Sequence, residues 1–464
     1  MATPPPQSAP AESTSQQQAP SSSSGTGLTD QELQDRNLPP LRGPWVRTQR
    51  QVPQLNPRDV AEQQLQKIES SYSGWLGGTA NSAFRSGNVG FSRLITLEAP
   101  FEVSQPMGYH ARFSLVPKPV FLDSGQADGS AVRSVQITTA NGKQRVTIPE
   151  PMGTLTGTDT NPPAQQNAMG VGGDLQFAFP HFAIAGGYTP FGFLVSTYTA
   201  RMMWKPGDGP VTVTASRDSV KDSQLSYAGL RDPAFASNAP KWGGVVANQG
   251  ALQFSHGDAQ SGFYFSVGGQ YLTGYNVRKN NRIDGTGGAY WRAFAAPEYG
   301  TLTIGANFFA MHYANNQNAF TYGMGGYFSP QIYFLANVPV TWTGHYQTRW
   351  HYNITGGVGV QAFQENATPL WPLYGQRALQ AATGNPMLPD FTSIGGNYDL
   401  RSQAAYQITP HLFAGGYLQA NNTRNYNYAS IGFYVRYIFR EQPSTVTAPT
   451  GLFPADGLRP FNVP

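Results

Sequence analysis

The C-terminal part of the chain contains a stretch in which apolar and other side chains alternate from residue 428 to residue 439. One set comprises Ala429, Ile431, Phe433, Val435, Tyr437 and Phe439, and the other comprises Tyr428, Ser430, Gly432, Tyr434 and Arg436. Successive side chains of a β-strand point to opposite faces, so the pattern predicts a strand with one apolar and one mostly polar face. Similar alternation at 174–179, 263–271 and 301–308, in strands of about ten residues, suits a tilted crossing of a membrane.

The composition favours a large β-structure over a helical enzyme. Only 12% of the residues are charged, where soluble domains average about 25%, and aromatic residues reach 13%. The sequence has no run of about 18 apolar residues and therefore predicts no transmembrane helix. The strands of a transmembrane barrel need only one apolar face, so a barrel is compatible with this hydropathy. Composition alone leaves a soluble β-sandwich or propeller equally open.

The connections between the predicted strands fall into two sizes. Short ones containing Pro or Gly are expected at 179–181, 206–209, Ser329-Pro330 and 409–411. Long polar ones are expected at 123–168, 217–241, 272–298 and 364–393. Short periplasmic turns and long outer loops are typical of outer-membrane barrels. We therefore predict an all-β fold, a transmembrane antiparallel β-barrel of about 16 strands over residues 72–440, with a short N-terminal helical linker and an aqueous lumen.

The sequence on either side of the predicted barrel has a different character. Residues 1–27 are rich in Pro, Ser, Gln and Ala and are predicted to be disordered. Residues 28–71 are predicted to form a periplasmic linker with short helices, one of which starts at Asn56 and Pro57. Residues 441–464 form a C-terminal tail with little patterning. The start MATPPPQSAP does not resemble a signal peptide, so we expect a longer precursor or a true start farther upstream.

Several classes of function are disfavoured by the sequence. It contains no cysteine, which excludes disulfides and cysteine-based metal sites. Its 30 basic and 26 acidic residues are too evenly balanced to suggest nucleic acid as a partner. Acidic residues such as Asp174, Asp218 and Asp399 are scattered, and no zinc, nucleophile or phosphate-binding motif occurs. We therefore predict that the chain is not an enzyme and needs no cofactor or metal.

Four longer stretches carry a family resemblance. They are SRDSVKDSQLSYAGLRDP at 216–233, GGAYWR at 287–292, GGYFSPQIYFLANVPV at 325–340 and TPHLFAGGYLQANNTRNYNYASIGFYVRYIF at 409–439. These stretches resemble the C-terminal barrel of cellulose synthase operon protein C, the outer-membrane export porin of bacterial cellulose. Family members carry tetratricopeptide helix pairs before the barrel, whereas residues 1–71 contain no repeat of about 34 residues.

The resemblance implies a function and a set of partners. The chain would be a porin that passes nascent cellulose, a β-1,4-glucan, from the periplasm to the cell exterior by passive conduction. It would lie in the lipid of the bacterial outer membrane. The inner-membrane cellulose synthase complex would be an indirect partner, through an upstream repeat region. Two alternatives stay open: a general porin or an exporter of another exopolysaccharide, and a soluble β-rich carbohydrate-binding protein.

A neutral glucan calls for aromatic and short polar side chains, because many weak contacts suit a sliding chain better than one tight site. The candidate substrate-binding residues, in the lumen or in a gate, are Arg217, Asp218, Lys221, Asp222, Tyr227, Arg231, Asp232, Trp291, Arg292, Asn421, Asn422, Tyr426 and Arg436. The charged residues of 216–233 are more readily interpreted as a structural network at the barrel rim, since paired charges are more often structural. Trp291 is also typical of the aromatic girdle at a membrane interface. An arginine facing lipid costs about 2–4 kcal/mol at the midplane, so Arg436 is expected to face the lumen.

Overall fold

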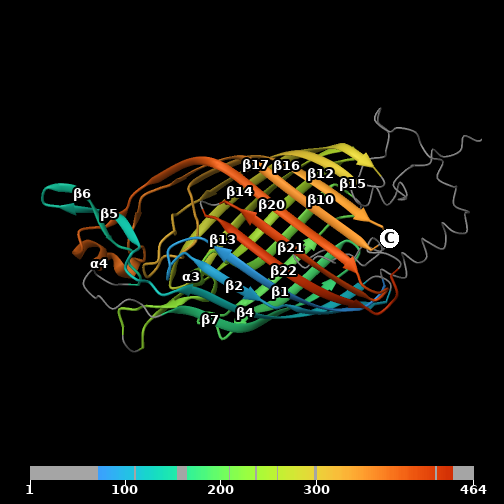
Figure 1. Cartoon of the computed structure of the whole chain (residues 1–464). Coiled ribbons are helices and arrows are strands. Elements are labelled where there is room, and N and C mark those ends of the chain that lie inside the picture. The colour runs from blue at the N-terminus through green and yellow to red at the C-terminus, as the bar shows by residue number, and fades with distance from the viewer. Residues whose placement is uncertain are drawn as a thin grey trace, which may run out of the picture.

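The computed structural model describes residues 72–442, apart from 109–110, 154–164, 208, 236–237, 259, 297–299, 348 and 424–425. The predictions for residues 1–71 and 443–464, including the linker helices and the tail, lie outside the described residues. The described part is built mainly of long tilted β-strands that wrap into a barrel (Figure 1). None of its helices is long and apolar enough to cross a membrane.

Sixteen antiparallel strands form the barrel, which confirms the predicted fold class and strand number. In chain order they are β1 (Trp75–Arg85), β2 (Leu94–Glu98) continued by β3 (Phe101–Met107), β4 (Ala111–Gly125), β7 (Gln166–Ala178), β8 (Phe182–Phe191), β9 (Tyr198–Trp204), β10 (Val211–Ser219), β12 (Lys241–Gly257), β13 (Ser261–Tyr275), β14 (Val277–Ala296), β15 (Gly300–Tyr313), β16 (Ile332–Tyr346), β17 (Trp350–Glu365), β20 (Phe391–Gln407), β21 (Leu412–Asn421) and β22 (Tyr428–Ile438). The last strand pairs with the first along its whole length, from Trp75 opposite Ile438 to Arg85 opposite Tyr428. The sheet is therefore closed, and no barrel strand has an open edge.

Each barrel strand has an outward and an inward face. On β22 the exposed Ile431, Phe433 and Val435 alternate with the buried Tyr434 and Arg436. Apolar side chains on the outward face of the other strands are likewise half exposed, among them Phe265 and Val267 of β13, Phe308 of β15 and Val358 of β17. An outward apolar surface that runs around a closed barrel matches the lipid-facing wall of a transmembrane barrel.

The two ends of the barrel differ in their connections. The chain enters and leaves at one end, where the Phe439 amide donates to the Gly74 carbonyl at 2.9 Å. The connections at that end are short, as at 179–181, 205–210 and 408–411. The opposite end carries the long connections 126–165, 220–240, 314–331 and 366–390. Three of the predicted long connections, at 123–168, 217–241 and 364–393, are thus confirmed.

Two of the predicted connections are wrong. Residues 272–298 do not form a long loop, because β13 and β14 run through them and are separated by Asn276 alone, which has a positive φ of 51°. Polar residues such as Asn280, Arg282 and Asp284 lie on the inward face of β14. Ser329-Pro330 is not a short turn but the end of the long connection 314–331. Turn-forming dipeptides also occur within long loops, so the local sequence could not separate the two cases.

A small sheet projects from the end with the long connections, beyond the barrel (Figure 1). It consists of β5 (Val132–Thr139), β6 (Gly142–Pro149), β18 (Thr368–Pro369) and β19 (Met387–Leu388). The helix α4 (Arg377–Ala382) follows the 3-10 turn η1 (Tyr374–Gln376) and packs through Leu379 against this sheet's core. The core contains Val135, Met324, Leu370, Trp371 and Leu388, so it joins three separate connections.

The assignment of faces predicts opposite effects for two adjacent positions. Val267→Arg, on the outward face of β13, should lower the free energy of unfolding in lipid vesicles by about 2–4 kcal/mol, because the charge would face hydrocarbon. Ser266→Arg, on the inward face, serves as the matched control and should change it by less than about 1 kcal/mol. Urea titration of both variants measures the difference. Equal destabilisation by both substitutions would contradict the assignment.

Candidate functional site

Much of the inner wall of the barrel is lined by neutral polar side chains. Gln270 of β13 donates to Gln249 of β12 at 3.1 Å, and the Tyr264 hydroxyl donates to the Asn307 carbonyl oxygen at 3.1 Å. Further bonds of this kind link Thr341 with Thr355 (2.9 Å) and Asn353 with Thr343 (2.7 Å). Hydroxyl and amide groups can each donate and accept, so such a wall can exchange hydrogen bonds with a hydroxyl-rich neutral molecule.

A compact group of charged residues interrupts this neutral wall on the strands β2 to β10. Arg201 of β9 lies with Nη2 2.8 Å from the Asp218 carboxylate of β10 and with Nη1 3.4 Å from that of Asp174 on β7. Lys221, just after β10, contacts Glu98 of β2 at 3.1 Å. Together with Lys118 of β4 these residues form what we call the inner charge cluster, namely Glu98, Lys118, Asp174, Arg201, Asp218 and Lys221. Five of its members and Tyr227 line a cavity of about 140 Å³.

The inner charge cluster is balanced, with three cations and three carboxylates. Burial opposes the charge of Lys221, but the nearby Glu98 carboxylate favours it, and the net effect raises the pKa of Lys221 above its usual value. Its ammonium group also lies 5.1 Å from the centre of the Tyr227 ring. Lys221 therefore stays charged at neutral pH, and the cluster offers donors and acceptors without a strong net field.

The long connections fold inward and pack together across the mouth of the barrel. The short helix α3 (Gln224–Ala228), in the connection between β10 and β12, is buried at every position. Leu225 of α3 belongs to one hydrophobic cluster with Phe91, Phe320 and Tyr327, which come from two other connections. The rings of Phe91 and Phe320 meet edge to face at 5.6 Å. These loops therefore form a packed assembly at the outer mouth rather than separate flexible segments.

Polar contacts tie the same loops together around Asp222. Its carboxylate accepts from the Phe328 amide at 3.1 Å and from the Tyr426 hydroxyl at 3.4 Å. Tyr426 in turn lies under the Arg85 guanidinium, 4.0 Å from the ring centre. Asp222 therefore joins connections that start from three separate points of the barrel, after β10, β15 and β21. We call Asp222, Phe328 and Tyr426 the loop latch.

The end of the barrel with the short connections has a different inner lining. Trp75 of β1 lies between two guanidinium groups, Arg112 at 3.9 Å and Arg436 at 5.1 Å from its ring. Arg436 also contacts the Glu102 carboxylate at 3.3 Å. Arg436 and Trp75 are almost fully buried, so the Arg436 side chain lies on the inner face, between the outward Val435 and Tyr437.

The structure brings some of the predicted site residues together. Asp218, Lys221 and Tyr227 meet in or beside the inner charge cluster, and Asp222 and Tyr426 meet in the loop latch. Arg292 and Arg436 are buried, and Arg436 lies on the inner wall near the end with the short connections. Whether any of these residues contacts a substrate stays a prediction.

Other predicted residues make contacts within the protein, and their role toward a substrate stays a prediction. Asn422 bridges strands, because its backbone carbonyl accepts from Gln361 at 2.9 Å and its side chain from the Tyr398 amide at 2.8 Å. Asn421 is buried beside it and accepts from Thr423. Asp232 is fully buried in the connection after α3 and accepts from the Ala234 amide, whereas the neighbouring Arg231 is exposed and donates to the Ala239 carbonyl.

Two predicted residues require correction, because they lie on the outer wall. Arg217 occupies the face of β10 opposite to Asp218, and its guanidinium packs over the exposed ring of Tyr198 at 4.3 Å. Trp291 is 53% exposed among the outward side chains of β14 and cannot line the lumen. β10 continues through Ser219 and β14 continues through Ala296, so adjacent residues at these positions point to opposite faces of the sheet.

The candidate residues chosen from the sequence include only two of the six members of the inner charge cluster, Asp218 and Lys221. Glu98, Lys118, Asp174 and Arg201 are single charges in otherwise unremarkable strands. They meet only because β2, β4, β7, β9 and β10 lie close together on the same inner wall. Their one local signal is position, since each alternates with apolar outward neighbours such as Leu97 and Met202. Within the described residues, no group of three or more His, Asp or Glu side chains is placed to hold a metal ion.

Comparison with known proteins gives one consistent family. The family described as "Cellulose synthase operon protein C C-terminus" matches residues 92–440. The chain is 29% identical over 455 residues to cellulose synthase operon protein C of Pseudomonas fluorescens strain SBW25, covering 97% of this chain and 32% of that protein. It is 30% identical over 353 residues to the protein of that name from Xanthomonas axonopodis pv. citri strain 306, covering 72% and 23%. The chain thus spans a third or less of the length of these relatives.

Among solved structures, one called "Bacterial polysaccharide outer membrane secretin" superimposes with a TM-score of 0.47 and 9% identity, over 80% of this chain and 99% of that one. A superposition this loose does not bear on function. The assignment of the barrel stands on the strand pairing of this chain itself.

The packing of the mouth predicts how one serine contributes. The Ser223 hydroxyl accepts from the Ser226 amide as the N-cap of α3 and donates to the Gly326 carbonyl at 2.7 Å. Ser223→Ala should destabilise this local packing by about 1–2 kcal/mol, because it removes a cap and a bond between two loops. Hydrogen exchange should speed up at the amides of both α3 and Gly326. Ser130→Ala, which removes a bond within an exposed turn, should leave those amides unchanged. Faster exchange in α3 alone would show that the two loops are not coupled.

Proposed function

The chain belongs to the family of the cellulose synthase operon protein C C-terminus and forms a barrel of the bacterial outer membrane, and from this premise we propose that it exports nascent cellulose to the cell exterior. The observation that carries the proposal is the inner wall, where neutral hydroxyl and amide groups predominate. The family and the fold are those of an outer-membrane barrel and not of a known enzyme family.

The chemistry of the wall suits a neutral glucan in transit. Each sugar carries hydroxyl groups around its edge. As the chain slides, the side chains of the wall can exchange a hydrogen bond to one sugar for a hydrogen bond to the next, at little cost in free energy. The balanced inner charge cluster adds donors and acceptors without selecting for a charged polymer. We propose that conduction is passive, with the driving force supplied by chain extension at the inner membrane.

The outer mouth would have to open for a polymer to leave. We propose that the loop latch, with the hydrophobic cluster around α3, is the gate, because it joins connections from widely separated strands. Opening would break the contacts of Asp222 to Phe328 and Tyr426 and expose part of the cluster to water. The cost of that exposure would keep the barrel closed in the absence of cargo.

A reversible cross-link tests the gate. The natural chain has no cysteine, so Phe91→Cys with Phe320→Cys introduces a single pair across two loops whose rings touch. After bridging by oxidation or by a short cleavable cross-linker, glucan release by cells that carry only this barrel should stop. Cleavage of the bridge should restore it.

The control places a pair of cysteines where no gate is proposed. Val132→Cys with Pro149→Cys bridges opposite residues of the β5–β6 hairpin, outside the barrel. That bridge should leave release unchanged. Undiminished export through the bridged Phe91–Phe320 variant would overturn the proposed gate.

The cargo is tested separately from the gate. Deletion of the gene should abolish secreted β-1,4-glucan, measured by cellulase-released sugar in the medium, while synthase activity in isolated membranes stays unchanged. Secretion that persists after the deletion, together with loss of another exopolysaccharide, would favour the alternative cargo. A protein that fractionates as soluble and shows no heat-dependent band shift would contradict the barrel.

A further inference from the structure

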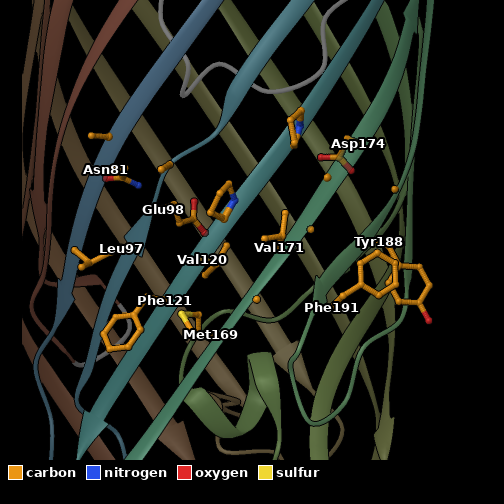
Figure 2. Close-up of a pocket in the computed structure, with 18 of the residues that line it drawn as sticks. Asn81, Leu97, Glu98, Val120, Phe121, Met169, Val171, Asp174, Tyr188 and Phe191 are labelled. Atoms are coloured by element: carbon orange, nitrogen blue, oxygen red, sulfur yellow. The ribbon is translucent and has the colours of Figure 1, made fainter.

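The outward wall of the barrel contains an apolar hollow of about 1300 Å³ over β1, β2, β4, β7 and β8 (Figure 2). Its floor consists of outward-facing residues that are small or compact, namely Ala80, Pro117, Pro119, Gly173 and Gly186. Leu97 and Phe121 border it on one side, and Tyr188 and Phe191 border it on the other (Figure 2). The hollow is therefore built into the strands and is not a gap between loops.

The irregular pairing of β4 explains where the hollow lies. Pro117 and Pro119 cannot donate hydrogen bonds, and the neighbouring strand is interrupted at Ala99 and Pro100. The ladders of β2 and β3 with β4 stop on either side of this point, and the Ala99 amide donates to the Pro119 carbonyl between them. Regular pairing on this side of β4 is thereby interrupted, and the outward surface there is recessed and apolar.

Two cations flank the turn at the outer end of the hollow. Arg217 donates to Thr197 at 3.2 Å, and Lys241 donates to the Leu194 carbonyl at 3.1 Å, so both hold the turn that joins β8 to β9. The other acceptors near Arg217 are Asn248 at 2.7 Å and the Tyr198 carbonyl at 3.3 Å. All the acceptors of Arg217 named here are neutral groups, so its charge is available to an anion.

The cations and the hollow form one continuous surface. Tyr198, which lies under Arg217, is the cross-strand partner of Tyr188, and Tyr188 stacks on Phe191 at 4.6 Å. Tyr188 and Phe191 are the border of the hollow on that side. The apolar part thus lies along the strands, and the cations lie at its outer end, beside the long loops.

We propose that this surface is a binding site for a phosphorylated glycolipid of the outer leaflet, with acyl chains in the hollow and a phosphate at Arg217 and Lys241. Charge complementarity favours this occupant over a second barrel or a single membrane-spanning segment, because an apolar partner would leave the cations unused. The order of the parts also matches a lipid, with its charge at the membrane surface and its chains below. The proposal depends on the outer-membrane position and not on the cargo.

The test uses the full chain in detergent and two lipid probes, bisphosphorylated lipid A and its fully dephosphorylated form, with binding followed by native mass spectrometry. Arg217→Gln should weaken binding of the bisphosphorylated form about fivefold and leave the dephosphorylated form unchanged. Arg145→Gln, an exposed arginine of the β6 hairpin, is its control and should change neither.

A second pair of variants tests the hollow. A side chain added at Gly186 meets no atom within 4 Å, so Gly186→Leu should fill the hollow without disturbing the strand. It should weaken binding of both lipid A forms about tenfold or more. Gly250→Leu, equally unobstructed and outward-facing on β12 but outside the hollow, should bind both normally.

Three results would overturn the proposal. The first is equal binding of both probes by all four variants and the natural chain, which would indicate an ordinary annulus of lipid. The second is loss of a dimer in Gly186→Leu, which would make the hollow a contact between copies. The third is equal affinity of the natural chain for the two probes, which would remove the role of the cations.

Discussion

The pairing of β22 with β1 is the interaction on which the rest of this structure depends. Backbone amide and carbonyl groups in a lipid environment have no water to bind, so a sheet that crosses the membrane must leave no edge. Every residue from Trp75 to Arg85 has a partner on β22, and the last strand thereby closes the ring begun by the first. Closure of sixteen antiparallel strands puts both ends of the barrel chain on one side, and it gives every strand one wet and one lipid-facing side.

Closure also determines where charges can lie. An inward charge has polar neighbours from several strands, as Arg201 does between Asp174 and Asp218. An outward charge is tolerable only near the ends of the strands, where lipid headgroups and water begin, and Arg217 lies there. The loops at the outer mouth are subject to neither the inward nor the outward restriction on charges. They pack against one another through apolar contacts such as that of Phe91 with Phe320. The barrel thus has a polar inner wall, and apolar contacts between loops close its outer mouth.

The sequence could predict what depends on local periodicity. Alternation gave the strands and their faces, and chain length gave their approximate number. It could not distinguish the polar residues of β14 from a polar loop, because residues such as Asn280 and Arg282 face the interior of the barrel and not bulk solvent. The inner charge cluster was partly missed for a related reason. Glu98 and Lys221 are far apart in the chain and meet through the closed sheet, which no local pattern encodes.

Arg217 and Asp218 are adjacent in the chain but face different environments. One backbone position separates a guanidinium on the lipid-facing wall from a carboxylate in the inner charge cluster. A motif such as SRDS therefore cannot have a single role, since its odd and even positions belong to different surfaces. Reading SRDSVKDS as one unit would merge two chemically independent requirements. One is a polar interior for the cargo, and the other is a charged rim at the membrane. Because strands alternate strictly, selection can change either surface without altering the other.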